Sequence, residues 1–185
     1  MDGPDSEASF QVIEGHPTSR VVIHVPHAST LIPDWVRERI RLNDDDLTCE
    51  LAFMTDARTD EIADAAADLA AVRPWIFVNL RSRLVVDPER FPNPEQEPMA
   101  APDIGMGAVY TRTAHGELLR DDDPAHHEAL LDRYLQPYAQ ALTRLVEERL
   151  AEVDEVTIID LHSYPLVELP YERLHHADAA RPEWA

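Results

Sequence analysis

The sequence contains no lysine, since all 16 of its basic residues are arginine. Schiff-base lysine chemistry and phosphate loops that depend on a lysine are therefore excluded. Glycine is also scarce, with five in 185 residues, and no G-x-S-x-G elbow or G-x-G-x-x-G segment occurs. These absences argue against serine-nucleophile hydrolases and nucleotide-binding proteins.

The sequence contains one cysteine, Cys49, so no disulfide can form within the chain. Its first residues, MDGPDSEASF, lack the positive start and the apolar stretch of a signal peptide. No apolar run approaches the roughly 20 residues that a membrane-spanning helix needs. We therefore expect a soluble, cytoplasmic protein in a reducing compartment.

Negative charge dominates the composition, with 36 acidic residues against 16 basic ones and a formal net charge of −20. Nucleic acids and anionic membranes bind proteins through clustered positive charge, so neither is expected as a partner. A small-molecule substrate is the expected partner, and the oligomeric state stays open.

Apolar and amphipathic segments alternate along the chain, after residues 1–9, which we expect to form a disordered leader. Strands are predicted at residues 19–25, 75–80, 83–87, 107–113 and 156–161. Helices are predicted at residues 30–42, 45–71 and 123–153, the last with a kink at Pro137. This alternation is typical of an α/β fold with a mainly parallel or mixed central sheet flanked by helices, here as one domain over residues 10–185.

Histidines stand at the carboxyl ends of two predicted strands that should be buried on both faces. VVIHVPHAST contains His24 and His27, and IIDLHSYP contains His162. A single histidine at a strand end is ordinarily a hydrogen-bonded polar cap. However, the carboxyl ends of parallel strands meet at one sheet edge, where α/β proteins bind their ligands. Two strand ends with histidine therefore favour a metal or catalytic site.

A carboxylate is needed to complete such a site, because a catalytic zinc ion takes three protein ligands and leaves a position for water. Asp56 is the candidate, since it follows a threonine at a helix start that faces the same sheet edge. The alternative is that Asp56 only interacts with the helix dipole. Asp160 lies two residues before His162, on the same face of an extended strand, and could orient that imidazole.

Six segments, taken in order, resemble the N-formylglutamate amidohydrolase (N-formylglutamate deformylase) family. They are VVIHVPHAST-x-IP, MTDARTDE, SRLVVDPERF, EPMA…GMGAVYTRT…LLR, LDRYLQPYAQAL and IIDLHSYP, and they span roughly residues 20–182. The resemblance implies a fold like that of the zinc carboxypeptidases (phosphorylase/hydrolase-like) and zinc-dependent hydrolysis of linear amides.

The resemblance also implies roles for the residues at the sheet edge. His27, Asp56 and His162 match the ligands of Zn²⁺ or another divalent metal. His24 falls where other members often have a different residue, so we expect it beside the ligands. With Asp160 it forms the expected catalytic pair next to the metal.

Three arginines surround a short predicted strand in NLRSRLVVDPERF: Arg81, Arg83 and Arg90. Guanidinium groups commonly bind a substrate carboxylate through two hydrogen bonds. The alternative is a set of surface salt bridges with the abundant acidic residues. The resemblance implies that Arg83 and Arg90 lie near the carboxylates of the substrate.

The implied reaction is attack of a zinc-activated water on an N-acyl acidic amino acid such as N-formylglutamate, a step of amino-acid catabolism. Two positions depart from the family: Ala139 replaces the histidine of PYH, and Glu89 the asparagine of D-x-N-R. Relatives also continue beyond RPEWA, with a glutamate that resembles a general base. Glu168 and Glu172 are possible substitutes.

Three functions thus remain open. The first is an active metal-dependent amidohydrolase on an N-acyl amino acid. The second is an inactive metal-binding remnant, because the C-terminal part of the family domain is absent. The third is a related hydrolase acting on another carboxylated amide or a peptide.

Overall fold

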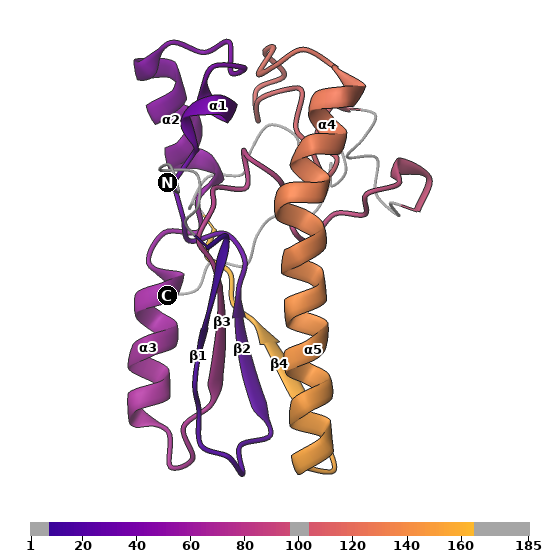
Figure 1. Ribbon diagram of the computed structural model, residues 1–185. Helices are drawn as coiled ribbons and strands as arrows, with labels where there is room; N and C mark the ends of the chain where they lie inside the picture. The colour runs from indigo at the N-terminus through magenta and orange to yellow at the C-terminus, as the bar shows by residue number, and fades with distance from the viewer. Residues whose placement is uncertain (1–7, 97–103, 165–185) are drawn as a thin grey trace, which may run out of the picture.

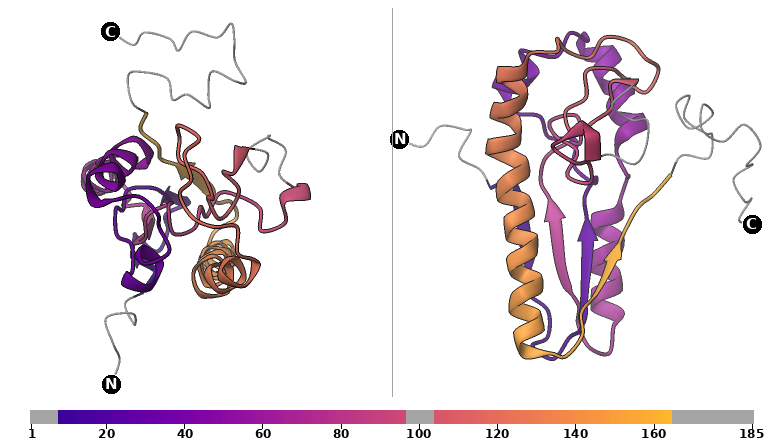
Figure 2. Two further views of the ribbon diagram at one scale, coloured as in Figure 1. Left: turned by 90° about the horizontal axis from the view of Figure 1, so that it is seen from above. Right: turned by 90° about the vertical axis from the view of Figure 1, so that its right-hand side faces the viewer.

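A four-stranded mixed sheet forms the centre of the computed structural model, which describes residues 8–96 and 104–164 (Figures 1 and 2). The strand order is β1-β3-β2-β4, with β1 antiparallel to β3 and the other pairs parallel. The strands are β1 (Phe10–Ile13), β2 (Val21–Val25), β3 (Trp75–Asn79) and β4 (Thr157–Asp160). The predicted α/β fold is confirmed.

Helices cover both faces of the sheet, α3 (Thr59–Leu69) on one and α5 (Gln136–Glu152) on the other (Figure 1). Because side chains alternate along a strand, β2 sends Val22 toward α5 and Ile23 toward α3. Val22 packs with Phe77, Tyr138 and Leu145, and Ile23 with residues of β3 and α3. This explains why β2 and β3 are continuous apolar runs.

The last strand differs from its prediction. The segment containing β4 is expected to be buried on both faces, yet all four residues of β4 are exposed. Among the described residues β4 pairs only with β2, so it forms an edge of the sheet. Ile158 and Ile159 are each 45% exposed.

The predicted helix over residues 45–71 is two helices, α2 (Asp44–Met54) and α3. Asn43 caps α2 by accepting a hydrogen bond from the backbone N–H of Asp46. The helix is interrupted at residues 55–58, where Arg58 adopts a left-handed φ of 66°. The break frees the backbone N–H of Asp56 to donate to the carbonyl of His27 at 3.0 Å. It therefore attaches Asp56 to the carboxyl end of β2.

Two predicted strands, residues 83–87 and 107–113, are not strands in the structure. They form buried turns and isolated bridges, joined where the N–H of Asp87 donates to the carbonyl of Ala108 at 2.8 Å. Helix α1 (Asp34–Arg37) starts at the predicted Pro-Asp signal but is a single turn, and a 3₁₀ turn, η2, spans Pro94–Gln96.

The long helix predicted at residues 123–153 is present, with an interruption. It consists of α4 (Pro124–Leu130), a π turn, η4 (Leu131–Leu135), and α5. The π turn ends just before Pro137, which has no N–H to donate to the preceding turn. The predicted disturbance at Pro137 thus takes the form of a wider turn.

Two further findings concern the expected location of the protein. Within the described residues, no helix has the length and apolar character needed to cross a lipid bilayer. The expected leader lies almost wholly outside the described residues, because these begin at Ala8.

Candidate metal centre

The carboxyl ends of β2 and β4 lie side by side, because the two strands are parallel and His24 is in register with Asp160. His27 follows β2 and His162 follows β4 along the chain. Their imidazole centroids are 5.4 Å apart, and His27 is 1% exposed. The structure therefore brings together the two histidines predicted as metal ligands.

Asp56 joins these histidines from the break between α2 and α3. Its Oδ2 lies 2.7 Å from Nδ1 of His162 and 3.6 Å from Nδ1 of His27. Asp56 therefore lies beside both predicted histidine ligands, although among the described residues the group of donors within 4.8 Å of one another joins these histidines to Glu89 and not to Asp56. The role of all three as ligands stays a prediction.

Two further carboxylates contact the other ring nitrogens. Oδ1 of Asp87 is 3.0 Å from Nε2 of His27. Glu89 approaches Nε2 of His27 at 3.4 Å and Nε2 of His162 at 3.3 Å. Each imidazole thus has a carboxylate near both nitrogens. Sequence reasoning did not assign Asp87 or Glu89 to the site, although the acidic pair in VVDPE follows a buried apolar segment.

Asp87 is the most buried charge of the site, with no exposed surface. It accepts hydrogen bonds from the guanidinium of Arg83 at 2.7 Å and the hydroxyl of Tyr110 at 2.5 Å. Burial alone would raise the pKa of the carboxyl, but Arg83, His27 and Tyr110 together hold that pKa well below its ordinary value. Asp87 is therefore an anion inside the fold.

The same balance between burial and neighbouring groups sets the pKa values of two predicted ligands, Asp56 and His27. Burial opposes the charged form of Asp56, yet the imidazole of His27 at 3.6 Å and the hydrogen bond with His162 outweigh it and lower the pKa of the carboxyl. Burial likewise opposes protonation of His27, while Asp56 and Asp87 favour it and raise its pKa overall. The site concentrates negative charge around two imidazoles, an environment that favours a cation.

Two of the three predicted substrate-binding arginines, Arg83 and Arg90, contact Asp87 of this centre. Besides the bond from Arg83, Nε of Arg90 lies 3.8 Å from Oδ2 of Asp87. Arg81 is 3% exposed, and its guanidinium carbon lies 6.0 Å from the ring centroid of Tyr134.

His24 belongs to a separate hydrogen-bonded group. Its Nδ1 contacts the carboxylate of Asp160, and its Nε2 lies 2.5 Å from the hydroxyl of Tyr138 on α5. Asp160 thus contacts His24, the residue with which it was paired from the sequence, and not His162, which the sequence suggested it could orient. Burial raises the pKa of Tyr138 well above its ordinary value, so Tyr138 is a neutral hydroxyl.

The donor groups suit a divalent metal, since zinc binds imidazole and carboxylate side chains. Two sets of three donors lie within 4.8 Å of one another: His27, Glu89 and His162, and His24, Glu89 and Asp160. In addition, Nδ1 of His27 is buried and has no hydrogen-bond partner. A buried ring nitrogen without a partner is costly, and a metal ion on that side would satisfy it.

Known proteins share this fold. A crystal structure of N-formylglutamate amidohydrolase from Ralstonia eutropha JMP134 matches with a TM-score of 0.73 at 23% identity, over 91% of this chain and 61% of that one. The crystal structure of a gene product from Agrobacterium tumefaciens matches with a TM-score of 0.67 at 19% identity, over 90% of this chain and 60% of that one. A search of curated proteins found no match.

The chain therefore spans about three fifths of the length of these two structures. The family model described as N-formylglutamate amidohydrolase matches residues 19–185, which is nearly the whole chain. The chain belongs to the N-formylglutamate amidohydrolase family.

Proposed function

We propose that this chain is a zinc-dependent amidohydrolase that hydrolyses the amide bond of an N-acyl acidic amino acid such as N-formylglutamate. Family membership supports hydrolysis of such an amide. The observation that carries the metal dependence is the meeting of His27, Asp56 and His162 at the sheet edge, with a buried, unpartnered nitrogen on His27. Zn²⁺ is the expected ion, and another divalent metal fits the same donors.

A metal could be held on either side of the two imidazoles: on the Nδ1 side with Asp56, or on the Nε2 side, where His27, Glu89 and His162 have donor atoms within 4.8 Å of one another. Nε2 of His27 is hydrogen-bonded to Asp87, which fixes the ring and leaves Nδ1 as the donor atom. Asp56 supplies the carboxylate on that side. A metal held by these side chains would supply polarisation of a substrate carbonyl and a lowered pKa for a bound water.

Glu89 lies on the opposite side of the imidazoles and is suited to a different task. Its side chain is 26% exposed, so its carboxylate reaches both the imidazoles and solvent. A carboxylate in this position could take a proton from a water held on the same Nε2 side, where Glu89 forms a group of three donors with His27 and His162, and return it to the leaving amine. Glu168 and Glu172, considered for this role from the sequence, lie outside the described residues.

The arginines supply the contact for an acidic substrate. Arg83 donates to Asp87 at 2.7 Å, which holds its guanidinium beside the predicted metal ligands. Arg90 stands beside the same carboxylate. We propose that these two side chains bind the substrate carboxylates, and that His24 with Asp160 holds the carboxyl ends of β2 and β4 together.

A catalytically inactive metal-binding protein is the second candidate. In such a protein the same donors would hold a metal without hydrolysis of an amide. The departures at Glu89 and Ala139 favour the third candidate, a hydrolase for another carboxylated amide or a peptide.

Zinc content and turnover of N-formylglutamate, measured on the same preparation, separate these candidates. Stoichiometric zinc with turnover supports the proposal, provided that His162→Ala abolishes both and His16→Ala, at a distant exposed histidine, abolishes neither. Zinc without turnover of any N-acyl amino acid supports the inactive protein. Full activity in His162→Ala would contradict the site.

A further inference from the structure

Arg120 is the largest side chain that is fully buried among the described residues. Its guanidinium has no carboxylate partner within the described part of the chain, and its Nε and Nη1 have no hydrogen-bond partner there. Burial lowers the pKa of the guanidinium to about 10, so the group is still a cation at pH 7. A buried charge without a counter-ion is costly, so its position in this fold needs an explanation.

The guanidinium contacts the Asp87 turn, which is our name for residues 83–87. Nη2 of Arg120 donates to the backbone carbonyl of Leu84, a residue with no exposed surface. The Asp87 turn is not a strand, so no sheet ladder supplies a donor to that carbonyl. Arg120 therefore donates to a backbone acceptor that is buried among apolar side chains.

A second segment, residues 108–111, holds Asp87 from another side, and we call it the supporting segment. The carbonyl of Ala108 accepts the N–H of Asp87 at 2.8 Å. The hydroxyl of Tyr110 donates to Oδ2 of Asp87 at 2.5 Å. The position of the Asp87 carboxylate thus depends on how the Asp87 turn and the supporting segment lie against each other.

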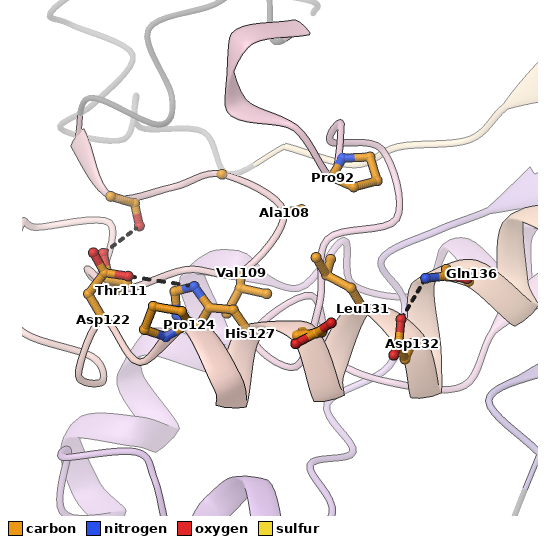
Figure 3. Close-up of a pocket in the computed structure, with 13 residues that line it drawn as sticks. Pro92, Ala108, Val109, Thr111, Asp122, Pro124, His127, Leu131, Asp132 and Gln136 are labelled. Atoms are coloured by element: carbon orange, nitrogen blue, oxygen red, sulfur yellow. Dashed lines mark hydrogen bonds and ion pairs between the residues drawn. The ribbon is translucent and has the colours of Figure 1, made fainter.

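The supporting segment is not packed on all sides. Ala108, Val109 and Thr111 line a cavity of about 720 Å³ that separates this segment from α4 and η4 (Figure 3). Polar contacts must therefore fix the segment on its other side. The backbone N–H of Arg120 donates to the carbonyl of Thr111 at 3.4 Å, while its side chain donates to the carbonyl of Leu84. Arg120 thus joins the supporting segment to the Asp87 turn.

Asp87 in turn orients the imidazole of His27. Its Oδ1 lies 3.0 Å from Nε2 of His27, which is a predicted metal ligand. A carboxylate that is hydrogen-bonded to a ligating histidine fixes the direction of the ring, and its loss commonly lowers metal affinity about 10- to 100-fold. The position of Asp87 is therefore part of the geometry of the centre.

We propose that Arg120 is a positioning residue of the metal centre, which holds the Asp87 turn against the supporting segment and so keeps Asp87 within hydrogen-bond distance of His27. This role explains a guanidinium buried without a carboxylate partner among the described residues, because the group that it holds is a backbone carbonyl. The inference rests on the proposed metal-dependent function, although the contact between Asp87 and His27 is present in the metal-free chain.

The variant Arg120→Met tests the proposal, since it keeps an unbranched side chain in the buried space and removes the donor. Removal of the guanidinium leaves no carboxylate of the described residues unpaired, so the variant should fold. We expect its Kd for zinc, measured by competition with a chelator, to rise about tenfold. If Arg120→Met does not fold, Arg120→Gln, whose shorter side chain cannot reach Leu84, takes its place with the same expected loss.

Arg149→Met is the matched control. Arg149 is 7% exposed, and its Nη2 donates to the backbone carbonyl of Pro17 at 2.6 Å. Its guanidinium carbon lies 4.8 Å from the ring centroid of Trp75, where β3 begins, so it is at the opposite end of the sheet from the metal centre. This control also loses a buried hydrogen bond to a carbonyl, yet it should leave the Kd for zinc within about twofold.

A second measurement does not depend on metal. In the metal-free wild type, the hydrogen bond to Asp87 should protect the imidazole N–H proton of His27 from exchange with solvent, which NMR detects. Exchange should be at least about tenfold faster in Arg120→Met and unchanged in Arg149→Met. Equal exchange in Arg120→Met and the wild type, or an equal effect of Arg149→Met, would overturn the proposal. A wild type without zinc affinity would overturn the metal centre and leave this test of Arg120 in place.

Discussion

His24 and His27 stand three residues apart at one end of β2, yet their surroundings differ. Both nitrogens of His24 already contact protein groups, Asp160 and the hydroxyl of Tyr138. Nδ1 of His27 has no hydrogen-bond partner, although carboxylates surround the ring. A histidine with hydrogen-bond partners at both ring nitrogens stabilises the fold. One with a buried nitrogen that has no hydrogen-bond partner is suited to act as a metal ligand.

The alternation of the strand explains the difference. His24 lies within β2, on the face that Val22 presents to α5, and its ring contacts Phe77. His27 lies beyond the strand end. The segment between α2 and α3 brings Asp56 to it, and the turns at residues 83–87 bring Asp87. Substitutions of the carboxylates and of the tyrosine around these histidines test this difference.

The largest expected effect is a difference in bound zinc between two variants, Asp56→Asn and Asp160→Asn. Each substitution neutralises a carboxylate that contacts a histidine at the same sheet edge. Asp56→Asn should lose stoichiometric zinc because it removes a ligand, while Asp160→Asn should retain it. Zinc per chain after dialysis, measured by mass spectrometry, checks this; equal zinc in the two variants would remove the distinction between the two groups.

Asp87→Asn should produce the largest change in stability. It leaves the Arg83 guanidinium without its buried partner, which costs about 3–5 kcal/mol of unfolding free energy. Urea denaturation of the metal-free protein measures the change, with Asp64→Asn at an exposed position of α3 as control. A loss within about 0.5 kcal/mol of the control would show that the buried pair contributes nothing.

Tyr138→Phe should change the hydrogen bonding of His24 and leave the surroundings of His27 unchanged. It leaves Nε2 of His24 buried without a partner, at a cost of about 1–3 kcal/mol, while the zinc affinity stays unchanged. Denaturation and zinc titration of the same sample check both parts. A large loss of zinc affinity would mean that the two histidine groups act as one unit.

The smallest effect is expected at Glu50, a buried carboxyl whose pKa is shifted in the opposite direction from that of Asp87. Burial raises the pKa of Glu50, although the backbone N–H of Ala114 donates to it at 2.7 Å. Because the pKa of Glu50 is higher in the folded than in the unfolded state, protonated Glu50 favours folding, and this contribution to stability is lost as pH rises through the folded pKa. Glu50→Gln should therefore be more stable than the wild type at pH 7, by a margin that shrinks toward pH about 4.5.

Denaturation curves at several pH values measure this margin, with Glu148→Gln as the exposed control. A margin independent of pH would show that the ionisation of Glu50 does not differ between the folded and unfolded states.

The central strands could be predicted from the sequence, because β2 and β3 are apolar on both faces and pack between helices. β1 was not predicted, since FQVI is short and only partly buried. The exposure of β4 depends on which strands lie beside it, and the local pattern does not contain that information.

The site could be predicted in part for the same reason. The positions of His27 and His162 follow from the ends of two parallel strands, and the structure brings Asp56 to them. Asp87 and Glu89 reach the site through a turn held by the carbonyl of Ala108, a contact about 20 residues distant in sequence that no local pattern reveals.

The exposed position of β4 also has a consequence for cooperativity. His162 follows a strand that is held along one side only within the described residues, so docking of that strand and metal binding should be thermodynamically linked. A metal ion shared by His27 and His162 would connect the ends of β2 and β4, and its binding free energy would suppress local opening of the edge. The amide protons of β4 should then exchange with solvent more slowly in zinc-loaded protein than in metal-free protein.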